Sequence, residues 1–164
     1  SVLIYCNFMR FFSLLFYLTF NFFLCVFVLF SGDLTKQKEI TKLVILSGEV
    51  GKHHYYYPSS LHFETGKLYK LVIRNESDSK HYFSSVGFAK SIFTRKIQVN
   101  IKGDKVSEVK GIIDEVELWP DNELEWWFVP IKTGEFDDLF CKVKDKKTNK
   151  SHKEMGMVGM IYIK

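Results

Sequence analysis

Cysteine is scarce in this chain, and its placement excludes a fold held by internal disulfides. Three cysteines occur among 164 residues, and Cys6 and Cys25 both lie in the N-terminal segment. Cys141 is therefore alone in the remainder of the sequence, where it has no disulfide partner. An unpaired cysteine of this kind is an intermolecular link, a free thiol or a metal ligand.

Acidic residues are absent from the first 32 positions, and Arg10 is the one basic residue there. Phe11 to Phe30 is an uncharged run long enough to cross a bilayer as a helix, and its charged start and apolar centre also match an export signal. Leu29 and Phe30 precede the small residues Ser31 and Gly32, so the cleavage pattern is incomplete. We expect residues 1–32 to be a signal peptide or membrane anchor, and residues 33–164 to form one periplasmic or otherwise extracytoplasmic domain.

Strong charge of either sign is also lacking. The formal net charge is +4, and residues 33–164 hold all 19 acidic residues and all but one of the 23 basic residues. This excess is mild and does not form a basic helix, so nucleic acid is not an expected partner.

Long helical patterns are missing from residues 33–164, where short apolar runs are separated by turn residues. We therefore predict an all-β, Greek-key β-sandwich, with one helical turn or short helix at Gly87–Phe93. The predicted strands are Leu43–Leu46, Leu61–Phe63, Leu68–Ile73, Ile97–Ile101, Val106–Val109, Val116–Leu118, Glu125–Val129, Phe136–Val143 and Met157–Ile163.

The last quarter of the chain carries metal-ligand residue types in a suggestive order. Ten residues separate Cys141 from His152, four separate His152 from Met157, and a strand-like run follows. One thiolate and two imidazoles with a weak thioether on the axis form a mononuclear copper site capable of fast one-electron cycling. The second imidazole should come from a distant strand, and His81 is our candidate.

Four sequence segments carry a family resemblance. They are Gly66–Asn75, which reads G-x-x-Y-x-L-x-I-x-N; His81-Tyr82-Phe83; Gly134-Glu135-Phe136 before Cys141; and Gly156-Met157-x-Gly159 within His152–Ile163. From about Thr65 onward the sequence resembles cupredoxins, the blue copper family of plastocyanin and azurin. The resemblance implies one type 1 copper ion with His81, Cys141 and His152 as equatorial ligands and Met157 as the axial ligand. It also implies that His152 is the ligand nearest solvent and the electron's exit.

Some residues depart from the family pattern or compete with these candidates. The Cys141–His152 loop is longer than in plastocyanin, and Tyr82 stands where many members have a small polar residue. Met155 competes with Met157 for the axial role. His53 and His54 form a second, surface candidate, but adjacent residues on a strand point to opposite faces and rarely reach one ion.

The sequence favours an electron carrier over an enzyme. Cys141 and His152 could act as nucleophile and base, but no orienting Asn or Asp is identifiable. A binuclear centre needs a second nearby cysteine, and a multicopper oxidase needs His-x-His pairs, which the chain lacks. The alternative function is copper storage, delivery or sensing, or a metal-free interaction module.

The expected partner is a redox protein, and residues 11–30 would add a membrane contact if they are not cleaved. Six lysines lie near His152, and their charge would steer an acidic docking face toward the site. The six are Lys142, Lys144, Lys146, Lys147, Lys150 and Lys153. A charge run of this kind is also typical of a solvated face.

Overall fold

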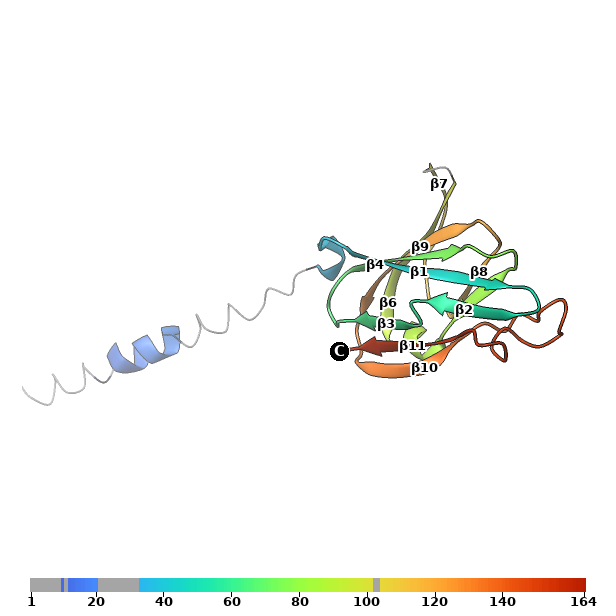
Figure 1. The fold of residues 1–164 in the computed structure, drawn as a ribbon. Helices are drawn as coiled ribbons and strands as arrows, with labels where there is room; N and C mark the ends of the chain where they lie inside the picture. Colours follow the sequence, from blue (N-terminus) through green and yellow to red (C-terminus); the bar gives the residue numbers. More distant parts are fainter. Residues whose placement is uncertain (1–9, 11, 21–32, 102–103) are drawn as a thin grey trace, which may run out of the picture. The chain divides into compact units, whose positions relative to one another are not determined.

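The computed structural model describes residue 10 and residues 12–20, 33–101 and 104–164 (Figure 1). The chain divides into two units, Ser1–Asp33 and Leu34–Lys164. Residues 10 and 12–20 are helical, whereas the rest of the apolar run predicted as a signal or anchor lies outside the described residues. None of the helices in the described ranges combines the length and apolar character needed to span a membrane.

Residues from Leu34 onward form two packed β-sheets, so the prediction of a β-sandwich is confirmed. One sheet has six strands in the order β2 (His53–Tyr57), β1 (Ile40–Glu49), β4 (Tyr69–Asn75), β9 (Glu123–Pro130), β6 (Ile92–Ile101) and β7 (Asp104–Val109). The other has five strands in the order β3 (Ser60–Phe63), β11 (Val158–Ile163), β10 (Gly134–Phe140), β5 (His81–Ser84) and β8 (Glu115–Leu118).

Two strands were not predicted, and both carry histidines. β2 and β5 are short and rich in His and Tyr, so they lack the aliphatic alternation that marks the other strands. The predicted strand Phe136–Val143 ends earlier, at Phe140, which leaves Cys141 at the start of a loop. The predicted helical turn is α2 (Val86–Ala89), and Ser85 caps it by accepting a hydrogen bond from the Phe88 N–H. A 3-10 turn, η1 (Leu34–Lys36), precedes β1.

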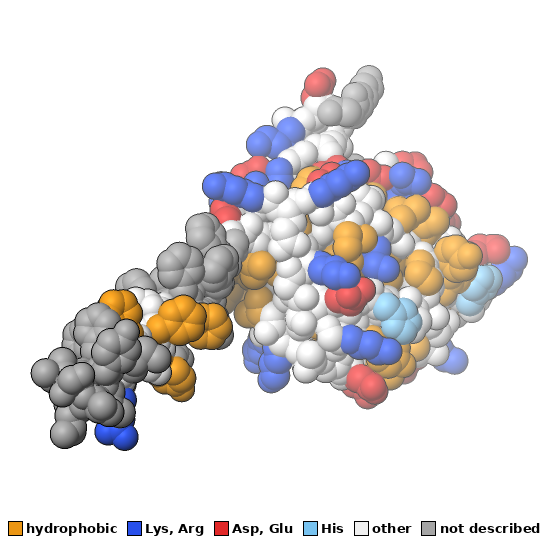
Figure 2. Space-filling view, turned by 90° about the vertical axis from the view of Figure 1, so that its left-hand side faces the viewer, with side chains coloured by type: hydrophobic (Ala, Val, Ile, Leu, Met, Phe, Trp, Pro, Cys, Tyr) orange, Lys and Arg blue, Asp and Glu red, His pale blue; other side chains and the backbone are white. Residues whose placement is uncertain are grey.

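The chain crosses between the sheets after most of its strands. Strands β1 and β4 pair in parallel, as do β3 and β11, because the intervening segments pass through the opposite sheet. Alternating residues face inward and pack an aromatic core that includes Phe63, Phe83, Phe88, Trp126 and Phe128. Outside this core the surface carries acidic and basic side chains interspersed, as Figure 2 shows for one face.

The strand ends gather several loops at one end of the sandwich. The turn between β1 and β2, the start of β5 and the loop of residues 141–157 meet there, as the Gly51–Asp145 and His81–His152 contacts show (Figure 1). Strand β10 enters the loop and β11 leaves it, and these two strands are paired. The loop therefore begins and ends on the rigid five-stranded sheet.

Gly159 of β11 tests how closely β11 packs against Leu139 and the Ser59 carbonyl. A Cβ at this position would lie 2.7 Å from Leu139 Cδ2 and 2.9 Å from the Ser59 carbonyl oxygen. We expect Gly159→Ala to lower the free energy of unfolding by about 1–3 kcal/mol, because the clash forces strands apart. Urea denaturation measures the change. Val158→Ala, at an exposed neighbouring position, should stay within about 0.5 kcal/mol, and equal stability of the two variants would contradict the packing argument.

Candidate metal centre

Three of the predicted ligand residues converge in one buried pocket. The Nδ1 atoms of His81 and His152 are 3.0 Å apart, and the Cys141 sulfur lies 3.8 Å from the first and 3.5 Å from the second. His81 is the first residue of β5, Cys141 directly follows β10, and His152 lies later in the same loop. All three side chains are at most 1% exposed.

The Cys141 sulfur is held by backbone donors. The Tyr82 N–H donates a hydrogen bond to Cys141 Sγ at 3.3 Å, and the Val143 N–H is a second donor. Burial raises the pKa of the Cys141 thiol, and these two donors oppose the rise. The main chain after His81 thus supplies the hydrogen bond, so the Tyr82 side chain is free to point outward.

His81 is oriented by a hydroxyl on its far side. Its Nε2 lies 2.7 Å from Ser77 Oγ, which directs Nδ1 toward Cys141 and His152. The Asn75 side chain positions this loop, because Oδ1 accepts from Ser77 and Nδ2 donates to the carbonyls of Ser79 and Leu118. The Asn that ends the motif in β4 therefore organises the approach to His81.

His152 does not reach the surface, although the family resemblance implies that it is the ligand nearest solvent. His152 is 1% exposed, and the ring of His54 covers it in a stacked contact with centroids 3.6 Å apart and planes 21° apart. His54 lies on β2, where burial alternates, so His53 faces outward and His54 faces the pocket. The interpretation of this pair as a surface site is also corrected, since His54 is buried.

Asp145 connects His54 to the loop of residues 141–157 by hydrogen bonds. Its carboxylate accepts from His54 Nε2 at 3.4 Å and from the backbone N–H groups of Gly51, Lys147 and Thr148. Burial by itself would raise the pKa of Asp145, but the N–H donors, with Thr148 foremost, lower it overall. The carboxylate stays charged and joins the β1–β2 turn to the loop that carries His152.

The three imidazoles influence one another. Burial lowers the pKa of His81 to about 3, with further lowering by His152 and His54. Burial and His54 lower the pKa of His152 to about 4, although Asp145 opposes the shift. At neutral pH both rings are uncharged and keep a lone pair, which is the form that binds metals.

The donor set fits a small first-row metal ion. Bonds of about 2.0 Å to nitrogen and about 2.3 Å to sulfur in a trigonal plane require N···S distances of about 3.7 Å and an N···N distance of about 3.5 Å. The observed N···S distances of 3.8 and 3.5 Å are close to this, whereas the two Nδ1 atoms, 3.0 Å apart, would have to separate on binding. One ring nitrogen from each of His54, His81 and His152 lies within 4.8 Å of the other two, so three imidazoles surround the candidate site. An imidazole binds metal in its ring plane, however, and the stacked His54 and His152 rings do not converge on one point in this arrangement.

Two methionines compete for the axis of the site, and their surroundings differ. Met157 is fully buried in the core cluster that includes Cys141, and its backbone bonds to both Cys141 and His152. The Met155 sulfur instead accepts a hydrogen bond from Thr148 Oγ1 at 3.4 Å on the exposed side of the loop. Burial and loop position therefore support Met157.

A two-sheet sandwich with His, Cys and His converging at one end defines a cupredoxin fold. Multicopper oxidases from Campylobacter jejuni (TM-score 0.53, 16% identity) and Pediococcus acidilactici (0.56, 15%) are similar in structure. So is the copper-containing nitrite reductase of Thermus scotoductus SA-01 (0.54, 14%). The matches cover 82%, 82% and 79% of this chain but 31%, 28% and 34% of those structures, so the chain spans about a third of their length. No family model and no curated protein matches the sequence.

Sequence reasoning missed His54, Asp145 and Ser77 as parts of the site. The signal for His54 was the period of two in His53–Tyr57 before a proline, which places alternate side chains inward. Asp145 was the one acidic residue between Cys141 and His152, and its burial follows from donors that are distant in sequence. Ser77 stood in a polar cluster that resembled an ordinary turn.

We expect His54 to cover the site without being a ligand. His54→Ala should weaken Co(II) binding by about tenfold, as removal of residues around metal ligands does, while the visible Co(II) spectrum keeps its form. His53→Ala, which changes the outward face of β2, is the matched control and should change neither. A changed Co(II) spectrum in His54→Ala would instead make His54 a ligand.

Metal binding should release about one proton per site at pH 7. The raised pKa of Cys141 means that the thiol must ionise, whereas His81 and His152 are already neutral. Apparent affinity should therefore rise about tenfold per pH unit around neutrality. Calorimetry with redox-inactive Zn(II) in buffers of different ionisation enthalpy counts the protons. A count of zero would show that Cys141 is not a ligand.

Proposed function

We propose that this domain binds one copper ion in a type 1 site and carries single electrons between redox partners. The observation that supports the proposal is the convergence of Cys141 Sγ with the Nδ1 atoms of His81 and His152 in a buried pocket. His81, Cys141 and His152 would be the equatorial ligands, and Met157 the axial ligand. The folds of known copper oxidases and nitrite reductases add support.

The proposed ligands favour redox cycling over substrate chemistry. A copper ion bound by thiolate and imidazole exchanges one electron, because the soft sulfur suits Cu(I) and the imidazoles suit Cu(II). The protein holds these ligands by hydrogen bonds that do not depend on oxidation state, from the Tyr82 N–H to sulfur and from the His81 Nε2–H to Ser77 Oγ. A pocket held in this way changes little on electron transfer, so the barrier is low.

Burial of the ligands separates the proposal from its alternative. A domain that stores, delivers or senses copper must let the ion pass to a partner, which requires ligands that solvent or another protein can reach. His81, Cys141 and His152 are instead sealed from solvent. The same burial protects a resident ion, as an electron carrier requires. A metal-free interaction module would have no need of the neutral, convergent imidazoles.

The same proposal covers the enzymatic status, the cellular location and the partner of the protein. We propose an electron carrier without enzymatic activity of its own, acting outside the cytoplasm with a redox protein as its partner. Residues 11–30 would be removed on export or retained as a membrane anchor. The known structures that resemble this chain are about three times its length, so any further activity would need residues beyond this domain.

Cu(II) titration of the full chain tests the proposal. We expect an intense blue absorption band and narrow copper hyperfine splitting at one equivalent, both lost in Cys141→Ser because the thiolate is absent. A pale complex in the unmodified chain would move the function to copper handling. Retained blue colour in Cys141→Ser would refute the assignment of the ligand.

The axial assignment has its own matched pair of variants. Met157→Leu should keep the blue colour and raise the reduction potential, because loss of the thioether destabilises Cu(II) relative to Cu(I). Met155→Leu should leave potential and spectrum unchanged, since its sulfur faces Thr148. Voltammetry of both variants decides between them, and a shift confined to Met155→Leu would reverse the assignment.

A further inference from the structure

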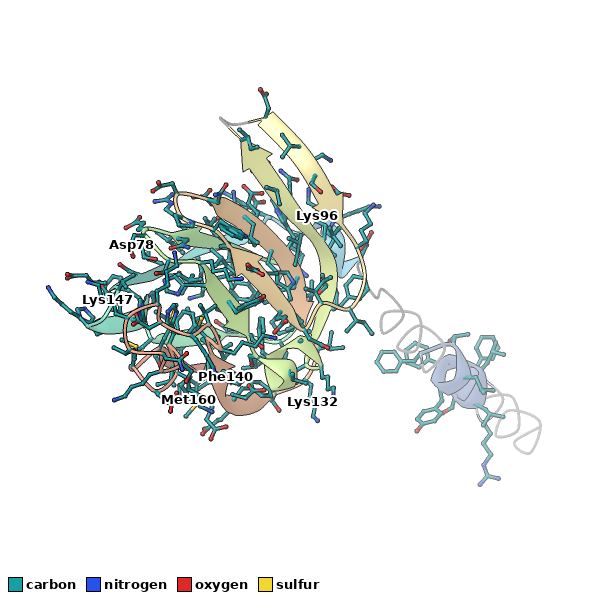
Figure 3. The ribbon with its side chains drawn as sticks, turned by 90° about the vertical axis from the view of Figure 1, so that its right-hand side faces the viewer. Asp78, Lys96, Lys132, Phe140, Lys147 and Met160 are labelled. Atoms are coloured by element: carbon teal, nitrogen blue, oxygen red, sulfur yellow. The ribbon has the colours of Figure 1, made fainter. Side chains whose placement is uncertain are left out.

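A groove lies against the loops that hold the metal-ligand residues. Its volume is about 190 Å³, and it combines an apolar floor with a charged rim. Trp119, Pro120 and Val143 supply the apolar surface, and Trp119 is 63% exposed. Such exposure of tryptophan at a groove edge is typical of an interface residue. Asp78, which also lines the groove, is labelled in Figure 3.

One wall of the groove is linked to His81 through a single hydroxyl. Ser79 lines the groove, and its carbonyl accepts a hydrogen bond from Ser77 Oγ at 3.0 Å. The same Ser77 oxygen lies 2.7 Å from His81 Nε2. An unbroken hydrogen-bonded path therefore runs from the groove to the ring whose opposite nitrogen faces the metal position.

The opposite wall is linked to the other two ligand residues. Val143 lines the groove, its N–H donates to the Cys141 sulfur, and its carbonyl accepts from the His152 N–H at 2.7 Å. Every equatorial ligand is thus one or two hydrogen bonds from this groove. On its other side, His152 is covered by the buried His54.

The rim of the groove is positively charged. Lys80, Lys144 and Lys146 line it, opposed by Asp78. Lys80 pairs with Glu117, but neither Lys144 nor Lys146 has an ion-pair partner within the described ranges. A surface that combines a small apolar area with more lysines than acidic residues complements a protein that presents an apolar side chain among carboxylates.

We propose that this groove, and not the His152 edge, is where an acidic redox protein docks and exchanges its electron with the centre. One electron lost by the partner's redox group is gained by the bound copper ion, or the reverse, and no bond or proton is transferred. The route runs through Ser79 and Ser77 to His81, and through Val143 to Cys141. The docking site rests on the function proposed above, but its binding step needs no metal.

The binding step is tested first, with the metal-free full chain. The probe is a glutamate-rich peptide with leucine at its centre, compared with the same peptide carrying glycine, and amide chemical shifts locate each one. We expect shifts around Ser79, Trp119 and Val143, with the leucine peptide bound about fivefold more tightly. Trp119→Ala should abolish the leucine advantage.

Charge-matched variants separate the groove from the net charge of the chain. Replacing Lys144 and Lys146 by Glu should weaken peptide binding by about tenfold or more. Replacing Lys90 and Lys132 by Glu changes the net charge equally at positions outside the groove, and Figure 3 shows Lys132 far from Asp78. This control should change affinity much less. Equal losses in the two double variants, or shifts centred on the β1–β2 turn over His54, would overturn the proposal.

Electron transfer is then followed in the copper-loaded chain. The leucine peptide carries a ruthenium tris-bipyridine group, whose photoexcited Ru(II) state donates one electron to Cu(II). We expect a slower first-order rate within the peptide complex in Ser77→Ala, at unchanged peptide affinity, and an unchanged rate in His53→Ala, which alters only the outward face of β2. The opposite pattern would overturn the groove route. Absence of the blue band would count against the proposed copper function. The chemical shifts measured with the metal-free chain test docking independently of that result.

Discussion

A thiolate can remain in the interior of this sandwich only if its negative charge is met inside the pocket. Burial raises the pKa of Cys141, so the neutral thiol is the favoured form until hydrogen-bond donors and a cation compensate. The N–H groups of Tyr82 and Val143 supply part of that compensation, and the rest must come from a bound ion. The two uncharged imidazoles do not supply it, because burial also holds them neutral. In the proposed copper site, the metal ion would supply the positive charge that ionised Cys141 requires.

Buried hydrogen bonds hold the loops that carry His81 and His152. Asn75 shapes the loop that orients His81, and Asp145 joins the β1–β2 turn to the loop that carries His152. Each is a buried polar residue whose hydrogen bonds are directed largely at the backbone, so each loop is held without large apolar side chains. Backbone anchors of this kind restrict the positions of the loops that carry His81 and His152.

Sequence reasoning predicted the β-sandwich and the proximity of His81, Cys141 and His152. It succeeded where the information is local: strand alternation, glycine turns and the order of residue types along one loop. It failed at His54 and Asp145 because their roles depend on a contact between β2 and the loop of residues 141–157. These two segments lie far apart in the sequence. It also placed His152 at the surface, since exposure depends on whatever packs over a side chain, and here that is His54.

The sealing of His152 changes how an electron could enter such a centre. Where a ligand ring reaches the surface, a partner can contact it directly, and docking needs only a flat apolar area around it. Here the ring lies beneath His54, and hydrogen bonds through Ser77 and Val143 connect the three residues to one groove. The long loop after Cys141 contributes to both features, because it holds Asp145, which anchors His54, and Lys144 and Lys146, which line the groove. The loop therefore connects the closed edge of the site with the lysines of the groove, and shortening it should change the two together.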